Sequence, residues 1–199
     1  MKTILLSAAA LAATVASPAF AADGYSYGSN NDGIGTYPVS ANVSDFCKLG
    51  TVSASAGNHT KIDGSFATGD ANVQVDLQDS NDQAQAWNQT LSIDNSICNR
   101  AFKISLTSDN GSMKNSTTGR GHGVGNFIQA LQYSIAVSFG GKTATVAASD
   151  VGNLGKSLLT GDPSVGSLTI ALSGAANTTG YLLAGNYSDT LRMTLQPNI

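Results

Sequence analysis

Short stretches with an apolar residue at every second position are the feature that most constrains how this chain can fold. They read "ANVQVDLQD", "AFKISLTSDNG", "ALQYSIAVSFGGK", "GSLTIALSG" and "YSDTLRMTLQP". A period of two is the pattern of a β-strand with one buried face, and the Asn-Gly and Gly-Gly pairs in these stretches are typical of turns between strands. Together with weaker stretches near residues 62 and 87, they predict seven to nine short strands.

The composition also favours strands over helices. Charged residues make up only 12% of the 199 residues, whereas helix-rich domains usually carry more Glu, Lys and Leu. No stretch has the period of an amphipathic helix, no segment is repeated, and residues 150–163 follow no regular pattern. We therefore expect an all-β protein, an antiparallel β-sandwich, with a single domain over residues 37–199.

The first residues have the organisation of a secretory signal. Lys2 precedes an apolar run that is too short to span a membrane, and the small-residue pattern Ala19-Phe20-Ala21 follows. We expect a signal peptide over residues 1–21 and a flexible tail, rich in Gly, Asn and Asp, over residues 22–36. The mature chain is expected to be exported and not to insert directly into a membrane.

The chain contains two cysteines, Cys47 and Cys98. In an exported protein, one pair is read by default as a disulfide. It would close a loop of roughly 50 residues and contribute about 4 kcal/mol to stability. Two free thiols are the alternative. A metal pair is disfavoured because neither cysteine has a second cysteine or a histidine nearby.

Candidate sites for chemistry are weak. His59 and His122 lie in polar loops, and nothing resembles a strained nucleophile turn. The three aspartates in "DLQDSND" fit a solvated acidic turn better than a calcium loop, and "GRGHGVG" lacks the Lys-Ser/Thr of a phosphate loop. The formal net charge is −3 without a basic cluster, which disfavours nucleic acid as a partner. We expect no enzymatic activity, no cofactor and no metal.

The stretch "YPVSANVSDFC" predicts an early strand that ends at Cys47. Its apolar side chains share one parity, and Pro38 falls on the other parity near the strand start, where a missing donor is tolerated. The residues on the apolar parity before the cysteine are Tyr37, Val39, Ala41 and Val43. With little charge nearby, these four side chains would form one face of a strand.

The closing stretch predicts a last strand from Tyr187 to Leu195, which must either pair into a sheet or stand as an open edge. "AGNYSDTLRMTLQP" resembles the C-terminal signature of the spore coat protein U domain family, which includes major subunits of archaic chaperone–usher pili. The last strand of that family typically reads Gly-x-Tyr-x-Asp, followed by alternating apolar residues. The matching positions here are Gly185, Tyr187, Asp189, Thr190, Leu191, Met193 and Leu195.

The placement of the cysteines agrees with this resemblance, because the family has an early strand that ends in cysteine and a second cysteine at the head of a strand like "CNRAFKISLTSDNG". Two features depart from the family pattern. The tail before residue 37 is longer than the pattern requires, and the segment after Cys47 lacks a Leu-x-Phe-Gly stretch.

The resemblance implies an incomplete immunoglobulin-like β-sandwich that lacks one strand. A periplasmic chaperone would fill the gap first, and at an outer-membrane usher the N-terminal segment of the next subunit would replace it. Residues 37–43 are the expected donor strand. Because such donation is head-to-tail, it produces a filament on the cell surface, which would support adhesion or biofilm formation. The alternative is a self-contained secreted β-sandwich that binds carbohydrate or a surface partner; an exported hydrolase is less favoured.

Overall fold

The computed structural model describes residues 38–63, 71–117, 126–152 and 154–199. The chain divides into two units, Met1–Asn42 and Val43–Ile199. The described part of the first unit, residues 38–42, contains no helix or strand, so every element below belongs to the second unit. The expected signal peptide and tail lie outside the described residues.

The larger sheet has six antiparallel strands in the order β1-β5-β13-β10-β11, with β2 also paired to β5. Its strands are β1 (Cys47–Lys48), β2 (Thr51–Ala54), β5 (Trp87–Cys98), β10 (Ser134–Phe139), β11 (Lys142–Ala147) and β13 (Ser164–Gly174). Gly140 and Gly141 connect β10 to β11 at φ values of +57° and +72°, a conformation that favours glycine. The turn predicted from this Gly-Gly pair is therefore confirmed.

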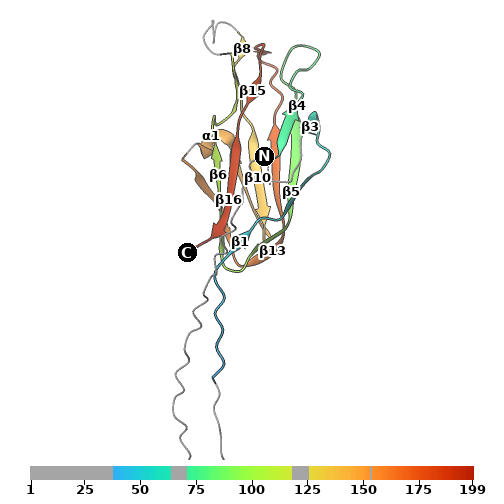
Figure 1. Ribbon diagram of the computed structural model, residues 1–199. Helices are drawn as coiled ribbons and strands as arrows, with labels where there is room; N and C mark the ends of the chain where they lie inside the picture. The colour runs from blue at the N-terminus through green and yellow to red at the C-terminus, as the bar shows by residue number, and fades with distance from the viewer. Residues whose placement is uncertain (1–37, 64–70, 118–125, 153) are drawn as a thin grey trace, which may run out of the picture. The chain divides into compact units, whose positions relative to one another are not determined.

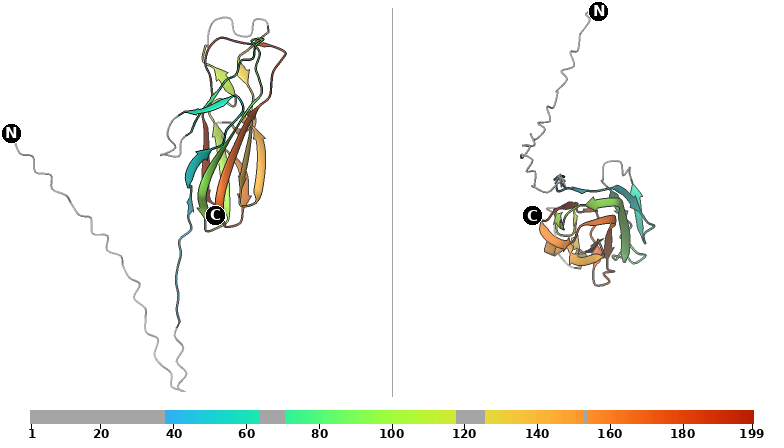
Figure 2. Two further views of the ribbon diagram at one scale, coloured as in Figure 1. Left: turned by 90° about the vertical axis from the view of Figure 1, so that its right-hand side faces the viewer. Right: turned by 90° about the horizontal axis from the view of Figure 1, so that it is seen from below.

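The smaller sheet has the order β12-β6-β16 and packs face to face with the larger one (Figures 1 and 2). Its strands are β6 (Phe102–Ser108), β12 (Lys156–Gly161) and β16 (Leu191–Pro197). The Phe102 ring meets the Phe139 ring of β10 edge-on at 4.9 Å, and both side chains are fully buried. One core thus lies between the two sheets, and the expected all-β antiparallel sandwich is confirmed.

The strand order follows the immunoglobulin arrangement up to its sixth strand. In that arrangement, strands A-B-E-D form one sheet and strands C-F-G form the other. Here β2-β5-β13-β10 takes the A-B-E-D order, and β6 and β16 pair as C and F do. Among the described residues, no strand occupies the position of G beside β16.

Short strands and one helical turn complete the second unit. They are β3 (Thr60–Asp63), β4 (Asn72–Val75), β7 (Met113–Asn115), β8 (Phe127–Ile128), β9 (Ala130–Leu131), α1 (Ala148–Val151), β14 (Tyr181–Leu182) and β15 (Tyr187–Ser188). We call the end of the sandwich with β8 and β15 the apex, and the end with β1 and the last residues of β16 the base (Figure 1). β14 pairs with β8 at the apex, whereas the Cys47–Cys98 and Pro197–Phe102 pairs lie at the base. No helix in the described ranges is long and apolar enough to span a membrane.

Three details of the expected strand pattern are wrong. Residues 38–46 form no strand, because no other strand of the described chain pairs with them. Residues 156–161 form β12 where irregular structure was expected; a register shift between Ser157 and Leu159 interrupts the alternation there. The closing strand is two strands, because the chain leaves β15 at Asp189 and starts β16 at Leu191.

Candidate functional site

β16 is an edge strand with one unpaired side. It pairs with β6 alone in the described part of the chain. Hydrogen bonds from Asp109 N to Thr190 O and from Asn198 N to Ala101 O flank this pairing. Because successive backbone groups in a strand point to opposite sides, the even-numbered residues of β16 face β6. The odd-numbered residues therefore direct their backbone N–H and C=O groups to the unpaired side.

The side chains of these odd-numbered residues form the inner row of β16, which we define as Leu191, Met193 and Leu195. They pack against the core but are only half-buried. Opposite Met193 and Leu195 in the register stand Leu106 and Ile104 of β6, which are 1% and 0% exposed. The inner row is therefore exposed on the side that faces away from β6.

This edge has little of the protection that sheet edges usually carry. Natural edge strands are blunted by charges, prolines or bulges. In β16 the inner row holds no charged residue, and the one proline, Pro197, stands at the end of the strand. Arg192 pairs with Asp109 on the outer face. The described edge is therefore able to accept a further strand that brings apolar side chains at every second position.

Asp189 holds the start of β16 in place. One carboxylate oxygen accepts hydrogen bonds from Ser108 Oγ at 2.6 Å and from Tyr133 Oη at 2.7 Å. The other accepts from the backbone N–H groups of Asn110 and Thr190, at 3.0 and 2.8 Å. Burial and the neighbouring carboxylate raise the pKa of Tyr133 far above its usual range. Asp189 thereby joins β16 to the end of β6 and to the segment before β10.

Tyr187 and Gly185 fix the apex next to Asp189. The Tyr187 hydroxyl donates to Ile128 O at 2.5 Å and accepts from Leu183 N at 2.9 Å. Gly185 has a φ of +136°, and a Cβ atom there would lie 2.5 Å from Thr117 Oγ1. The structure therefore gives Gly185, Tyr187 and Asp189 positioning roles: they shape the apex and set where the open edge begins.

The N-terminal segment, residues 37–43, which we call the arm, has exposed apolar side chains where it is described. Val39 is 95% exposed and Val43 is 72% exposed, and Ala41 is exposed as well. Tyr37 lies outside the described residues. The arm therefore leaves the three described members of its apolar face uncovered.

The residues after the arm, 44–49, which we call the arm root, are held to the base by Asn99. Its side chain accepts from Phe46 N and donates to Ser44 O, both at 2.8 Å, and its backbone N–H donates to Phe46 O at 3.1 Å. Arg100 pairs with Asp45 beside these bonds. The sequence contained no periodic signal for this anchor, because it joins residues more than 50 positions apart.

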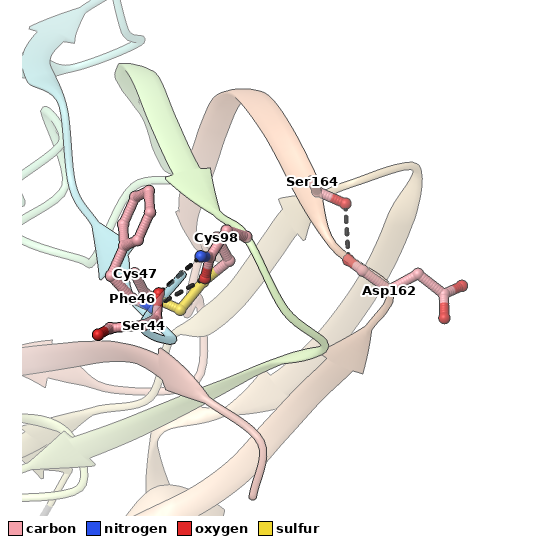
Figure 3. The surroundings of a disulfide bond; sticks show 7 residues. Ser44, Phe46, Cys47, Cys98, Asp162 and Ser164 are labelled. Atoms are coloured by element: carbon pink, nitrogen blue, oxygen red, sulfur yellow. Dashed lines mark hydrogen bonds between the residues drawn. A yellow bond between two sulfur atoms is a disulfide. The ribbon is translucent and has the colours of Figure 1, made fainter. Parts of the chain in front are cut away.

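Cys47 and Cys98 form the expected disulfide, and Cys47 lies within the arm root. They stand directly opposite each other in the pairing of β1 with β5, and Figure 3 shows Ser44 and Phe46 beside them. Cys98 is 2% exposed and Cys47 is half-buried, so this covalent link lies where the arm root meets the sandwich.

The described residues contain no cluster of metal-binding side chains. No cluster of three or more His, Cys, Asp or Glu in these ranges is placed to hold a metal ion. Asp79, one of the aspartates considered for calcium, accepts from Asn81 N and Gln83 N instead, and these backbone bonds lower its pKa. His59 is exposed, whereas His122 and the Gly-rich stretch 119–125 fall outside the described residues. No family model, curated protein or solved structure matches the chain.

Proposed function

We propose that this protein is a structural subunit of a bacterial surface fibre that assembles by donor-strand exchange and supports adhesion or biofilm formation. In this proposal the arm of one copy pairs with β16 of the next. A periplasmic chaperone occupies that edge during transit, and an outer-membrane usher is where the exchange takes place. The single observation that carries the proposal is the presence, in one chain, of an unpaired apolar edge and of an uncovered strand-like segment.

The two parts match in length and pattern. β16 has 7 residues, with the inner row at every second position, and the arm spans residues 37–43, with apolar side chains at every second position. Strand addition of this kind gains affinity from backbone hydrogen bonds and specificity from alternate side chains. The exposed arm would supply both, and it would cover the half-buried inner row.

The anchored arm root favours donation to another copy over self-pairing. β16 runs from the apex to the base, and β1 starts at the base. If the arm lay parallel to its own β16, it would have to reverse direction within residues 44–46 to enter β1. If it lay antiparallel, it would end at the apex, and the four residue steps from Val43 to Cys47, at most about 14 Å, would have to return along the 7 residues of β16 to the base. Residues 44–46 are instead hydrogen-bonded to Asn99, so self-pairing would break at least part of that anchor.

The test places two charges on the apolar face of the arm. The double variant Val39→Asp with Val43→Asp should leave the secreted subunit folded, because residues 38–43 contribute no strand to the sandwich. It should prevent fibres, because each aspartate would enter an apolar site without a partner. Folding is read by circular dichroism and protease resistance, and assembly by SDS-resistant ladders in unheated gels and by electron microscopy.

The matched control adds the same two charges on the opposite face of the arm. Ser40 and Asn42 are exposed and lie on the polar parity, so Ser40→Asp with Asn42→Asp should retain most of the fibre yield. Equal fibre yield from both double variants would contradict the proposal. A wild-type chain that remains a stable monomer under all assembly conditions would favour the self-contained binding sandwich.

A further inference from the structure

Two exposed aromatic rings at the apex take no part in the proposed pairing of the arm with β16. Phe127 of β8 and Tyr181 of β14 stand opposite each other in a parallel pairing. Their ring centroids are 6.3 Å apart with an interplanar angle of 50°. The side chains are 51% and 46% exposed, so the two rings present adjoining apolar surface to solvent.

Hydrogen bonds hold this pair in a defined position. Tyr181 N donates to Asn126 O at 2.8 Å, and Leu182 N donates to Asp82 O at 3.0 Å. Ile128, the neighbour of Phe127 in β8, is bound through its carbonyl by the Tyr187 hydroxyl. Exposed aromatic side chains that are held in place are typical of the buried centre of protein interfaces.

The direction of β16 determines which end of a neighbouring copy reaches this pair. An arm antiparallel to β16 runs from the base to the apex, so its root leaves at Leu191. A parallel arm would leave its root at Pro197, at the base, where the accepting copy's own arm root and disulfide stand. Only the antiparallel arrangement lets each copy accept one arm while it donates its own.

The arm root is too short to keep the donating copy away from the apex. Val43 and Cys47 are separated by four residue steps, which span at most about 14 Å. Asn99 of the donating copy also binds Ser44 directly, so its base follows the arm closely. The arm root carries exposed apolar surface of its own, with Phe46 43% and Leu49 40% exposed.

We propose that Phe127 and Tyr181 form a docking surface for the arm root of the second copy of this chain whose arm lies on β16. This inference rests on the proposed function. It adds a second contact between neighbouring subunits, beside the inserted strand, in which apolar surface of the apex packs on apolar surface of the root. The contact would limit how freely one subunit turns relative to the next.

The test introduces the photo-crosslinking residue p-benzoylphenylalanine at position 127, and separately at position 181, in the full chain. Equal amounts of 15N-labelled and unlabelled copies are assembled and irradiated, so that mass spectrometry distinguishes crosslinks between copies from those within one copy. Crosslinks between copies from the probe to residues 44–49 are expected in fibres and not in the monomer. As a control, the probe at Leu154, which is 97% exposed, should give no crosslink to residues 44–49.

The outcomes separate this inference from the proposed function. Fibres in which both probes crosslink elsewhere, or only within their own copy, would overturn the docking surface and leave strand donation intact. A wild-type chain that forms no fibres would overturn both.

Discussion

Asp189 connects parts of the apex that are far apart in the sequence. Its carboxylate accepts from Ser108, Tyr133, Asn110 and Thr190, and Ser108 is 1% exposed. Substitution of Asp189 tests whether this residue stabilises the start of β16.

Asp189→Ala should lower the free energy of unfolding by about 2–4 kcal/mol, because it leaves the buried hydroxyls of Ser108 and Tyr133 without an acceptor. Urea unfolding measures the change. Asp162 is the matched control, because this exposed aspartate contributes its backbone oxygen, not its carboxylate, to the bond with Ser164. Asp162→Ala should change stability by less than about 0.5 kcal/mol. Equal effects of the two variants would contradict the role given to Asp189.

Tyr133 makes stability depend on pH in the alkaline range. Its pKa is raised in the folded protein, first by burial and then by Asp189. An unfolded tyrosine loses its proton near pH 10, so above that pH the unfolded chain binds fewer protons than the folded one. The stability that is present below pH 10 should then fall with rising pH, at up to about 1.4 kcal/mol per pH unit. Urea unfolding between pH 8 and 11 should show this loss in the wild type, and a smaller slope in Tyr133→Phe. Equal slopes of stability against pH in the wild type and in Tyr133→Phe would contradict the contribution of Tyr133.

At the scale of elements, the two faces of β16 should differ in their sensitivity to an added charge. Leu195 lies in the half-buried inner row and Thr194 is exposed on the outer face, so an aspartate at each position tests one face of the strand. Leu195→Asp should cost several kcal/mol, because a charge enters an apolar site without a partner, and it should abolish fibres. Thr194→Asp should leave thermal stability and fibre yield nearly unchanged. Normal yield of protease-resistant protein from Leu195→Asp would contradict the packing of Leu195 against the core.

The disulfide joins β1 to β5 across a sequence separation of 51 residues. Replacing both cysteines by serine should lower the free energy of unfolding by about 4 kcal/mol in the chain-entropy model. It should also loosen the arm root, whose bonds to Asn99 adjoin Cys98. The mass of the unreduced wild type should be lower by two hydrogens than that of the reduced chain. An unchanged mass would show that the disulfide does not form. A serine variant as stable as the wild type would show that the disulfide does not stabilise the fold.

The elements also show what the sequence could predict. The strands with unbroken alternation, such as β6, β10 and β13, were predicted because each has one face in the core. β12 was missed, because Leu158 and Leu159 are adjacent at a register shift. Residues 38–46 have alternating apolar residues but form no strand. Such a pattern shows that one face of the segment could be buried, but it does not show that a neighbouring strand is available to pair with it. The Asn99 anchor left no trace in the sequence, since it depends on hydrogen bonds between distant segments.

At the scale of the whole molecule, the fold fits the head-to-tail growth that we propose. The arm root is anchored at the base, while the unpaired edge of β16 begins at the apex beside the Gly185–Asp189 motif. In the proposed assembly a copy would therefore donate at one end and accept at the other, which is the geometry that produces open filaments rather than closed pairs. The motif that carries the resemblance to pilus subunits lies where the unpaired edge of β16 begins, whereas the proposed donor strand is identified by its alternating apolar residues alone.

Amide hydrogen exchange along β16, read residue by residue by NMR, tests strand donation most directly. In the monomer, the amides of Leu191, Met193 and Leu195 should exchange fast because they face the unpaired side, whereas those of Arg192, Thr194 and Gln196 should be protected by pairing with β6. In fibres, after quenched exchange and dissolution, all six should be protected. Alternating protection that becomes uniform on assembly is the expected result. Uniform protection in the monomer, or an unchanged alternating pattern in fibres, would contradict donation onto this edge.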